Sequence, residues 1–230
     1  MKRHLKRIAA PKSWAIKRKK TKFLIRPNPS GHPMGLSIPL SIFLKDMTKY
    51  AKTTKDVKNI LTNKEVFVDG KRRKDRKFSV GFMDVVKLPD AKENYRVLLN
   101  TRGKLFVQQI DDTEAQTKLC KIIGKTLLKK AKMQVNLNDG KNILIKEGNY
   151  KVGDSIVLNL KDYTVKEHFP IEKGVIAFLI SGKNIGKTGH IEEVKEEGYM
   201  FKDQDNNQYP VMKSSVFVIG KDKAAIKLEN

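Results

Sequence analysis

Cationic side chains interleaved with aromatic rings form the most informative pattern of this sequence. Residues 1–45 contain 12 lysines and arginines and no carboxylate, and His4, Trp14 and Phe23 lie among them. Because cations neutralise phosphates and rings stack on bases, an extended segment of this composition is suited to RNA. The pattern predicts that RNA is bound by Lys2, Arg3, His4, Lys6, Arg7, Lys12, Trp14, Lys17, Arg18, Lys19, Lys20, Lys22 and Arg26. A solvated tail or a localisation signal is the alternative that charge alone leaves open.

Two further basic clusters follow. The first places lysines at three-residue intervals, which brings several of them towards one side of a helix. The second is a basic loop after an Asp-Gly turn. Together they place ten cations in a small region, which favours an RNA-binding face over an ordinary solvated surface. The residues are Lys49, Lys52, Lys55 and Lys58 in the first cluster, and Lys71, Arg72, Arg73, Lys74, Arg76 and Lys77 in the second.

The loop from Gly182 to Gly189 superficially resembles a nucleotide-binding loop. Such a loop needs four residues before its Gly-Lys-Ser/Thr group and a long helix after it. Three residues separate Gly182 from Gly186, and further strands follow instead of a helix. We therefore reject nucleotide binding. Because residues 171–230 carry no net charge, we expect only local RNA contacts there, by Lys183 and Lys187, with contacts to a neighbouring protein as the alternative.

The charge balance points to a polyanionic partner. The chain has 230 residues and a formal net charge of +23, so nucleic acid is the first partner to consider and an acidic membrane surface the second. The excess is +12 over residues 1–45 and zero over residues 171–230, and all nine arginines lie at or before Arg102. Arginine forks onto phosphate, so specific contacts are expected in the first hundred residues. A lysine-rich genome with chance placement of the arginines is the alternative.

Catalysis, metals and membranes find no support in the sequence. The four histidines show no ligand spacing, and no nucleophile stands in a motif with a base. Cys120 is the only cysteine, which excludes an internal disulfide and suits a reducing compartment. The apolar run Val175–Ile180 is too short to span a bilayer, and no signal peptide is apparent. We expect a soluble cytoplasmic protein without catalytic residues, metal, cofactor or small-molecule substrate.

Residues 1–36 are predicted to be a basic N-terminal extension. Three prolines between residues 27 and 33 predict a loop near its end. Because the extension has few apolar residues, it cannot bury enough surface to fold alone. We expect it to become ordered only on its partner.

A compact domain with helices is predicted over residues 37–90. Apolar residues at intervals of three and four predict one helix capped by Ser37 and another capped by Thr53 or the next threonine. Strands are predicted over residues 65–68 and 84–88, with a tight Asp-Gly turn after the first.

The remaining chain is predicted to be mostly β, which makes the fold class α+β. A β-rich central domain is expected over residues 91–170, with a short helix at Glu114–Ile123, and a small domain over residues 171–230. Turn signals at Thr101–Gly103, Asn138–Gly140 and Val152–Asp154 separate the central strands. The last domain has strand candidates at Val175–Ile180, Tyr199–Lys202, Gln208–Met212 and Val216–Ile219.

Several segments resemble the ribosomal protein S-four-e family of the archaeal and eukaryotic small subunit. The N-terminal signature of that family is matched by His4, Lys6, Arg7, Ile8, Pro11, Trp14 and Ile16. Residues 66–70 and 78–86 resemble the hairpin of an S-four-type RNA-binding domain. Residues 182–191 resemble a KOW motif, and residues 216–220 the closing strand of the family.

The resemblance implies a structural constituent of the small ribosomal subunit. Its expected partners are small-subunit rRNA and neighbouring small-subunit proteins, with no membrane contact and no homo-oligomer. The implied fold combines an S-four-type unit of two helices and a hairpin, a central β-rich domain and a C-terminal barrel of the KOW type. The chain lacks the long basic C-terminal tail of eukaryotic members, so an archaeal source is expected. An RNA-modifying enzyme and a KOW-containing transcription or translation factor are the rival interpretations.

Overall fold

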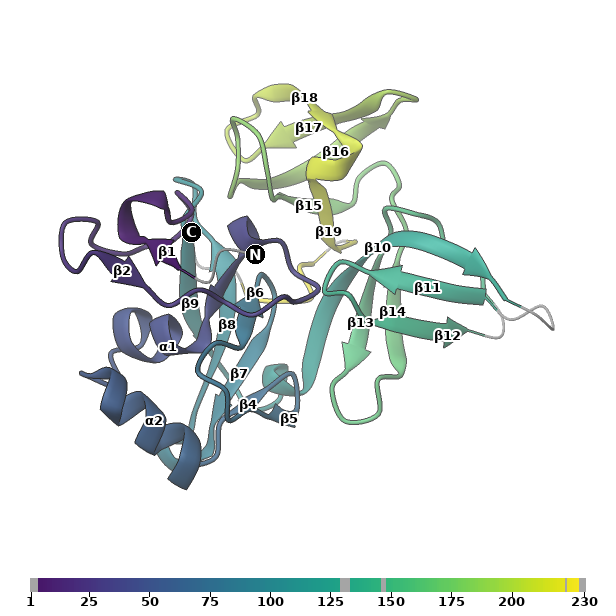
Figure 1. The fold of residues 1–230 in the computed structure, drawn as a ribbon. Coiled ribbons are helices and arrows are strands. Elements are labelled where there is room, and N and C mark those ends of the chain that lie inside the picture. The colour runs from purple at the N-terminus through teal and green to yellow at the C-terminus, as the bar shows by residue number, and fades with distance from the viewer. Residues whose placement is uncertain (1–3, 129–132, 146–147, 222, 228–230) are drawn as a thin grey trace. The chain divides into compact units, whose positions relative to one another are not determined.

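The computed structural model describes residues 4–128, 133–145, 148–221 and 223–227. Strands dominate it and helices are few, which confirms the mostly β prediction. The chain forms two compact units, which Figure 1 colours along the sequence. Unit 1 contains residues 1–98 and 104–116, and unit 2 contains residues 99–103 and 117–230.

The N-terminal segment of unit 1 is folded. Strand β1 (Leu5–Lys6) pairs with β2 (Phe23–Leu24), and 3-10 turns form at Arg7–Ala9 and Met34–Leu36. Trp14 is only 1% exposed, and its indole Nε1 donates a hydrogen bond to the carbonyl oxygen of Ser37 at 2.8 Å. The prediction that this segment becomes ordered only on RNA was wrong. A single large ring buries enough surface to dock it.

The first helix of unit 1 starts later than the sequence suggested. Strand β3 (Ser37–Pro39) pairs with β6 (Ser79–Gly81), so Ser37 is extended and its hydroxyl donates to the carbonyl oxygen of Pro33 at 3.1 Å instead of capping. Helix α1 (Leu40–Ile42) follows and continues into a π-helical turn (Phe43–Met47).

The second helix, α2 (Thr54–Asn63), begins at the predicted cap. The Thr53 hydroxyl accepts a hydrogen bond from the backbone N–H of Asp56 at 3.1 Å, and the Asp56 carboxylate accepts one from the Thr53 N–H at 2.8 Å. These bonds to Thr53 lower the pKa of Asp56. Val57 and Leu61 are buried, and the lysines of the other face remain in solvent.

A five-stranded sheet completes unit 1 in the order β5-β4-β7-β8-β9. The Asp-Gly turn has left-handed backbone at Asp69 and Gly70, and the start of the predicted basic loop forms a strand beyond it. The hairpin β8–β9 pairs with β7, so unit 1 extends to Gln116, whereas the sequence placed a boundary after residue 90. The strands are β4 (Phe67–Val68), β5 (Lys71–Arg72), β7 (Val85–Leu88), β8 (Glu93–Leu99) and β9 (Leu105–Ile110), with a 3-10 turn at Pro89–Ala91.

Unit 2 begins with a sheet in the order β12-β11-β10-β13-β14. The short helix predicted at Glu114–Ile123 was wrong, because a 3-10 turn at Glu114–Gln116 leads directly into a long strand. That strand has partners on both sides and places Cys120 and Ile122 in the core, so pairing overrides the local apolar spacing. The strands are β10 (Thr117–Leu127), β11 (Met133–Leu137), β12 (Asn142–Ile145), β13 (Ser155–Asn159) and β14 (Val165–Phe169).

A second sheet of unit 2 has the order β18-β17-β16-β15-β19. Its strands are β15 (Ile176–Leu179), β16 (Thr188–Val194), β17 (Gly198–Asp203), β18 (Gln208–Met212) and β19 (Val216–Gly220), with a 3-10 turn at Lys213–Ser215. Four of these strands match predicted segments, and β16 was not predicted. Lys121 of β10 links the two sheets, because its ammonium donates to the carbonyl oxygens of Lys213, Ser214 and Val216. Burial lowers the pKa of Lys121 to about 8.

A buried ion pair lies inside the first sheet of unit 2. The ammonium of Lys118 is 2.9 Å from Oδ2 of Asp139, and the two side chains are 0% and 2% exposed. Lys141 Nζ lies 3.0 Å from the same oxygen. Burial alone raises the pKa of Asp139, but the two lysines outweigh it and hold that pKa at about 2.

We expect acid to destabilise unit 2 through Asp139. The pKa of Asp139 is about 2 in the folded protein and 3.8 ordinarily. The ionised carboxylate therefore contributes its full stabilisation above pH 3.8, and this contribution is lost as the pH falls towards 2. The shift corresponds to about 2 kcal/mol. Urea unfolding between pH 5 and pH 2 measures it. The stability difference between the wild type and Asp139→Asn should shrink over this range, and a constant difference would contradict the assignment.

Candidate nucleic-acid interface

Two predicted RNA-binding arginines instead build the N-terminal segment. Arg7 is 5% exposed, and its guanidinium donates to the carbonyl oxygens of Thr21 at 2.8 Å and Lys17 at 2.9 Å. Arg18 donates to the carbonyl oxygens of Ala10 at 2.9 Å and Pro11 at 2.8 Å. Both side chains satisfy backbone carbonyls of a loop that has little regular structure, so they stabilise its shape.

The predicted stacking residue is also internal. Trp14 lies in the core of unit 1 and presents no face to a base. Phe23, in contrast, is 52% exposed, with the His4 ring at 5.8 Å and the Lys22 ammonium at 5.6 Å from its centroid. The exposed ring that stands among cations is therefore Phe23, whose type and basic surroundings were visible in the sequence.

The folded loop leaves its lysines in solvent. Arg7 and Arg18 hold the loop from within, whereas its lysines project outward and Arg26 is half-buried. The exposed residues are Lys6, Lys12, Lys17, Lys19, Lys20 and Lys22. Lys2 and Arg3 lie outside the described residues.

A cleft of about 350 Å³ joins the N-terminal segment to the helical part of unit 1. We call it the cation cleft. All the charged side chains that line it are cations, and Thr21, Ser41 and Thr54 add hydroxyl groups. The five cations are Arg7, Arg26, Lys45, Arg76 and Lys77.

Backbone pairing brings these distant cations together. The N–H of Asn28 donates to the carbonyl oxygen of Lys77 at 2.9 Å, and the Asn28 amide donates to Asp75 at 2.5 Å. The N–H of Ser41 donates to the carbonyl oxygen of Arg76 at 3.0 Å, which holds the basic loop against α1. In Figure 1 β2 and α1 are neighbours in unit 1, and residues of both elements line the cation cleft.

His32 fastens the end of the N-terminal segment to the same part of unit 1. Its Nε2 is 3.0 Å from Oδ1 of Asp84, and the side chains are 6% and 4% exposed. Gly81 makes room for this contact, since a Cβ there would lie 2.2 Å from the imidazole ring. A residue with a side chain at position 81 would displace His32.

The sequence missed Lys45 as part of this site. Lys45 follows Ser41 by four residues and Ile42 by three, and both line the cation cleft with it. Helical spacing from these residues would have placed Lys45 on the same face. The neighbouring sequence, however, does not indicate which face of this helix the N-terminal segment contacts.

The other predicted residues are spread over unit 1 and unit 2. Lys49, Lys52, Lys55 and Lys58 are exposed around α2, as are Lys71, Arg72, Lys74 and Lys77. Arg72 lies 3.5 Å from Glu65, and the Arg73 guanidinium stacks on Phe78 at 4.2 Å, so these two serve internal contacts.

The two loop lysines of unit 2 differ from each other. Lys183 is exposed, as predicted. Lys187 is half-buried and paired with Asp203, and its hydrogen bond to that carboxylate raises its pKa. Lys187 therefore has a structural partner that the sequence did not reveal.

Over the part of the chain that the structure describes, no three His, Cys, Asp or Glu side chains are grouped to hold a metal ion. No described helix is long and apolar enough to cross a membrane. The histidines His32 and His168 each pair with a buried aspartate, Asp84 and Asp154.

Comparison with known proteins relates the chain to one family. The model "Ribosomal family S4e" matches residues 91–165, and the model "RS4NT (NUC023) domain" matches residues 1–35. The "Small ribosomal subunit protein eS4" of Methanocaldococcus jannaschii is 40% identical over 240 residues, which cover 99% of this chain and 98% of the relative. That of Methanopyrus kandleri is 37% identical over 98% of this chain and 95% of its own.

A solved structure from the same family has a similar fold. The crystal structure of the 30S ribosomal protein S4e from Thermoplasma acidophilum is 30% identical and superposes with a TM-score of 0.69. It covers 81% of this chain and 96% of its own.

Proposed function

The chain belongs to the S4e family of ribosomal proteins, and from this premise we propose that it is a structural constituent of the small ribosomal subunit that binds small-subunit rRNA and supports assembly and translation. The family consists of structural proteins, which confirms that the chain is not an enzyme and excludes the RNA-modifying rival. Its location is the cytoplasmic ribosome, and the two relatives named above are archaeal.

The cation cleft is the single observation that carries the RNA-binding proposal. Its volume of about 350 Å³ admits a phosphate, and four cations line it beside Arg7, whose guanidinium holds the wall of the cleft through Thr21 and Lys17. Arginine forks bind phosphate oxygens with two parallel hydrogen bonds, and lysine adds a point charge. Backbone pairing already brings the segments that carry these cations together. RNA binding therefore does not have to pay the entropy of bringing them together from an unfolded segment.

The exposed lysines around the cleft extend the proposed interface. Lys12, Lys17, Lys19, Lys20 and Lys22 stand on the loop of the N-terminal segment, and Phe23 offers a ring to an unpaired base. The lysines around α2 and the basic residues after Gly70 continue the positive surface of unit 1. Lys183 stays within the proposal because its side chain is exposed. Lys2 and Arg3 stay within it on the sequence pattern alone.

The finer domain types are also part of this proposal. Two helices followed by strands and a basic turn support an S-four-type RNA-binding unit over residues 37–90, to which the β8–β9 hairpin adds strands. Five antiparallel strands over residues 176–220 support a small barrel of the KOW type. Neighbouring small-subunit proteins are the other partners that we propose, and we propose a single copy instead of a homo-oligomer.

Removing two cations from the cleft should weaken RNA binding. We expect Arg76→Gln with Lys77→Gln to lower affinity for small-subunit rRNA roughly tenfold at moderate salt, because two phosphate contacts disappear. The slope of log affinity against log salt should fall by about 1.5. Filter binding or fluorescence anisotropy across a salt series measures both.

The matched control is Lys161→Gln with Lys166→Gln, two exposed lysines of unit 2. This variant has the same net charge and should keep both the affinity and the slope near wild type. Equal losses in the two variants would mean that total charge, and not the cation cleft, determines binding.

A further inference from the structure

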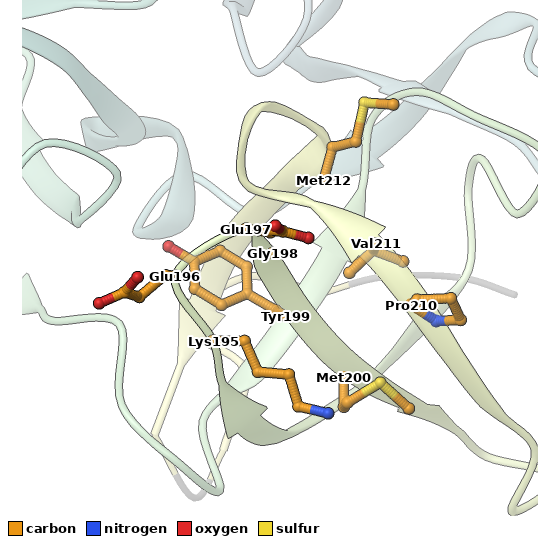
Figure 2. Close-up of a pocket in the computed structure, with 9 residues that line it drawn as sticks. All are labelled: Lys195, Glu196, Glu197, Gly198, Tyr199, Met200, Pro210, Val211 and Met212. Atoms are coloured by element: carbon orange, nitrogen blue, oxygen red, sulfur yellow. The ribbon is translucent and has the colours of Figure 1, made fainter.

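A groove on the second sheet of unit 2 differs in chemistry from the rest of the protein. It has a volume of about 580 Å³ and is lined by strands β17 and β18 and by the turn that precedes β17. Figure 2 shows its side chains: Met200, Pro210, Val211 and Met212 supply an apolar surface, and the charged residues Lys195, Glu196 and Glu197 come from the turn before β17. Met212 is 72% exposed and nearby Val194 is 53% exposed. An apolar patch with a polar rim is typical of a protein interaction site.

The charge of this region is opposite to that of the chain. Residues 192–197 contain four glutamates and one lysine, within a protein of net charge +23. An adjoining hollow of about 540 Å³ shares Lys195 with the groove and adds Lys173 and three glutamates, Glu172, Glu192 and Glu193, to its lining. Phosphates are repelled from such a surface, so RNA is not its natural occupant.

Two of the glutamates are available for a partner. Glu193 lies 3.2 Å from Lys195, and Glu192 lies 3.3 Å from Lys202. Among the described residues, no ion pair joins Glu196 or Glu197 to a cation. Cationic side chains from another protein would complete them next to an apolar surface.

The edge of the sheet limits how that partner binds. Strand β18 is the edge strand, and Pro210 lies at its centre, opposite Met200. Proline has no N–H to offer, so an added strand would lose a ladder hydrogen bond there. Binding through side chains that insert between the methionines avoids this loss, and methionine adapts its shape to an incoming apolar residue.

We propose that this groove docks an apolar segment bearing lysine or arginine from a neighbouring protein of the small subunit. The inference rests on the proposed function, which places the chain among the proteins of the small subunit. It goes beyond that function by assigning a protein-binding surface. Apolar residues of the segment contact Met200, Pro210 and Met212, and its cations pair with Glu196 and Glu197.

Site-specific photo-crosslinking in assembled small subunits tests the proposal. The full chain carries p-benzoyl-phenylalanine in place of Met212, and crosslinked products are identified by mass spectrometry after nuclease treatment. We expect crosslinks to a protein peptide that contains lysine or arginine beside apolar residues. The same group placed at Phe23 is the comparison, and there we expect crosslinks to rRNA.

Charge reversal provides the second arm. Glu196→Lys with Glu197→Lys should lower the yield of the Met212 protein crosslink roughly tenfold, because like charges then meet at the rim. Asp162→Lys with Asp205→Lys changes net charge equally at exposed positions outside the groove and should leave the yield unchanged.

The possible outcomes separate this inference from the proposed function. A crosslink from Met212 to rRNA, no crosslink at all, or a protein crosslink that ignores the charge reversal would each overturn the docking groove. Recovery of the chain in the small-subunit fraction is read separately in the same samples. A chain that is absent from that fraction contradicts the proposed function, whereas a chain that is present without the expected crosslink contradicts the groove alone.

Discussion

Trp14→Ala is expected to lower the free energy of unfolding of unit 1 by about 3–5 kcal/mol, because it empties the site of a large buried side chain. The ring is 1% exposed, and its N–H bond to Ser37 disappears with it. The N-terminal segment should then detach from β3 and α1. Thermal unfolding measures the loss. Hydrogen exchange at Leu105 reports the detachment, because its N–H donates to the carbonyl oxygen of Ser13 at 2.7 Å.

Phe23→Ala is the matched control for this prediction. Phe23 is 52% exposed, so its removal should change stability by less than about 0.5 kcal/mol. Because base stacking contributes about 1–3 kcal/mol, the same variant should still weaken rRNA binding. The two aromatic positions therefore separate stability from RNA contact. A stable Trp14→Ala protein with weak RNA binding would reverse the two roles and contradict the structure.

Asp139→Asn is expected to lower the stability of unit 2 by about 3–5 kcal/mol, because the variant removes the countercharge of a buried ammonium. Lys118 is 0% exposed and lies 2.9 Å from Asp139. Unit 2 depends on this pair because it lies beside the cluster that contains Cys120 and Ile122. Urea unfolding at neutral pH, followed by a probe in unit 2, measures the loss.

Two variants test the physical reason for that loss. Asp162→Asn removes an exposed carboxylate and should leave stability unchanged. Lys118→Met combined with Asp139→Asn should recover most of the loss, because no ammonium then remains to be buried. If the double variant is as unstable as Asp139→Asn alone, the carboxylate matters for its other hydrogen bonds and not for neutralising Lys118.

The comparison of Trp14 with Phe23 shows where sequence reasoning stops. Both rings stand among cations within the first 25 residues, and nothing local distinguishes them. Burial depends on contacts with Met34 and Ser37, 20 and 23 residues further along the chain. Arg7 and Arg18 present the same problem, since an arginine can bind a backbone carbonyl or a phosphate with the same donors.

The error over Glu114–Ile123 has a related cause. Leu119, Cys120, Ile122 and Ile123 are compatible with one face of a short helix and also with a strand. The pairing of β10 with β11 and β13 decides between them, and both partners come later in the sequence. The helix cap at Thr53 or Thr54, in contrast, could be predicted, and the structure places it at Thr53, because a cap depends on donors and acceptors within four residues.

The sequence by itself determined the large positive charge excess and its concentration in the N-terminal segment, the mostly β class, the positions of most turns and the family. These depend on composition, on period and on short motifs, all of which are local along the chain. The tertiary structure alone decided that the N-terminal segment is folded, which of its cations are exposed to solvent, and that Lys45 joins Arg76 and Lys77 at one cleft. The physical reason is that burial and charge neutralisation depend on distances between segments that are remote in sequence, and only the packed chain sets those distances.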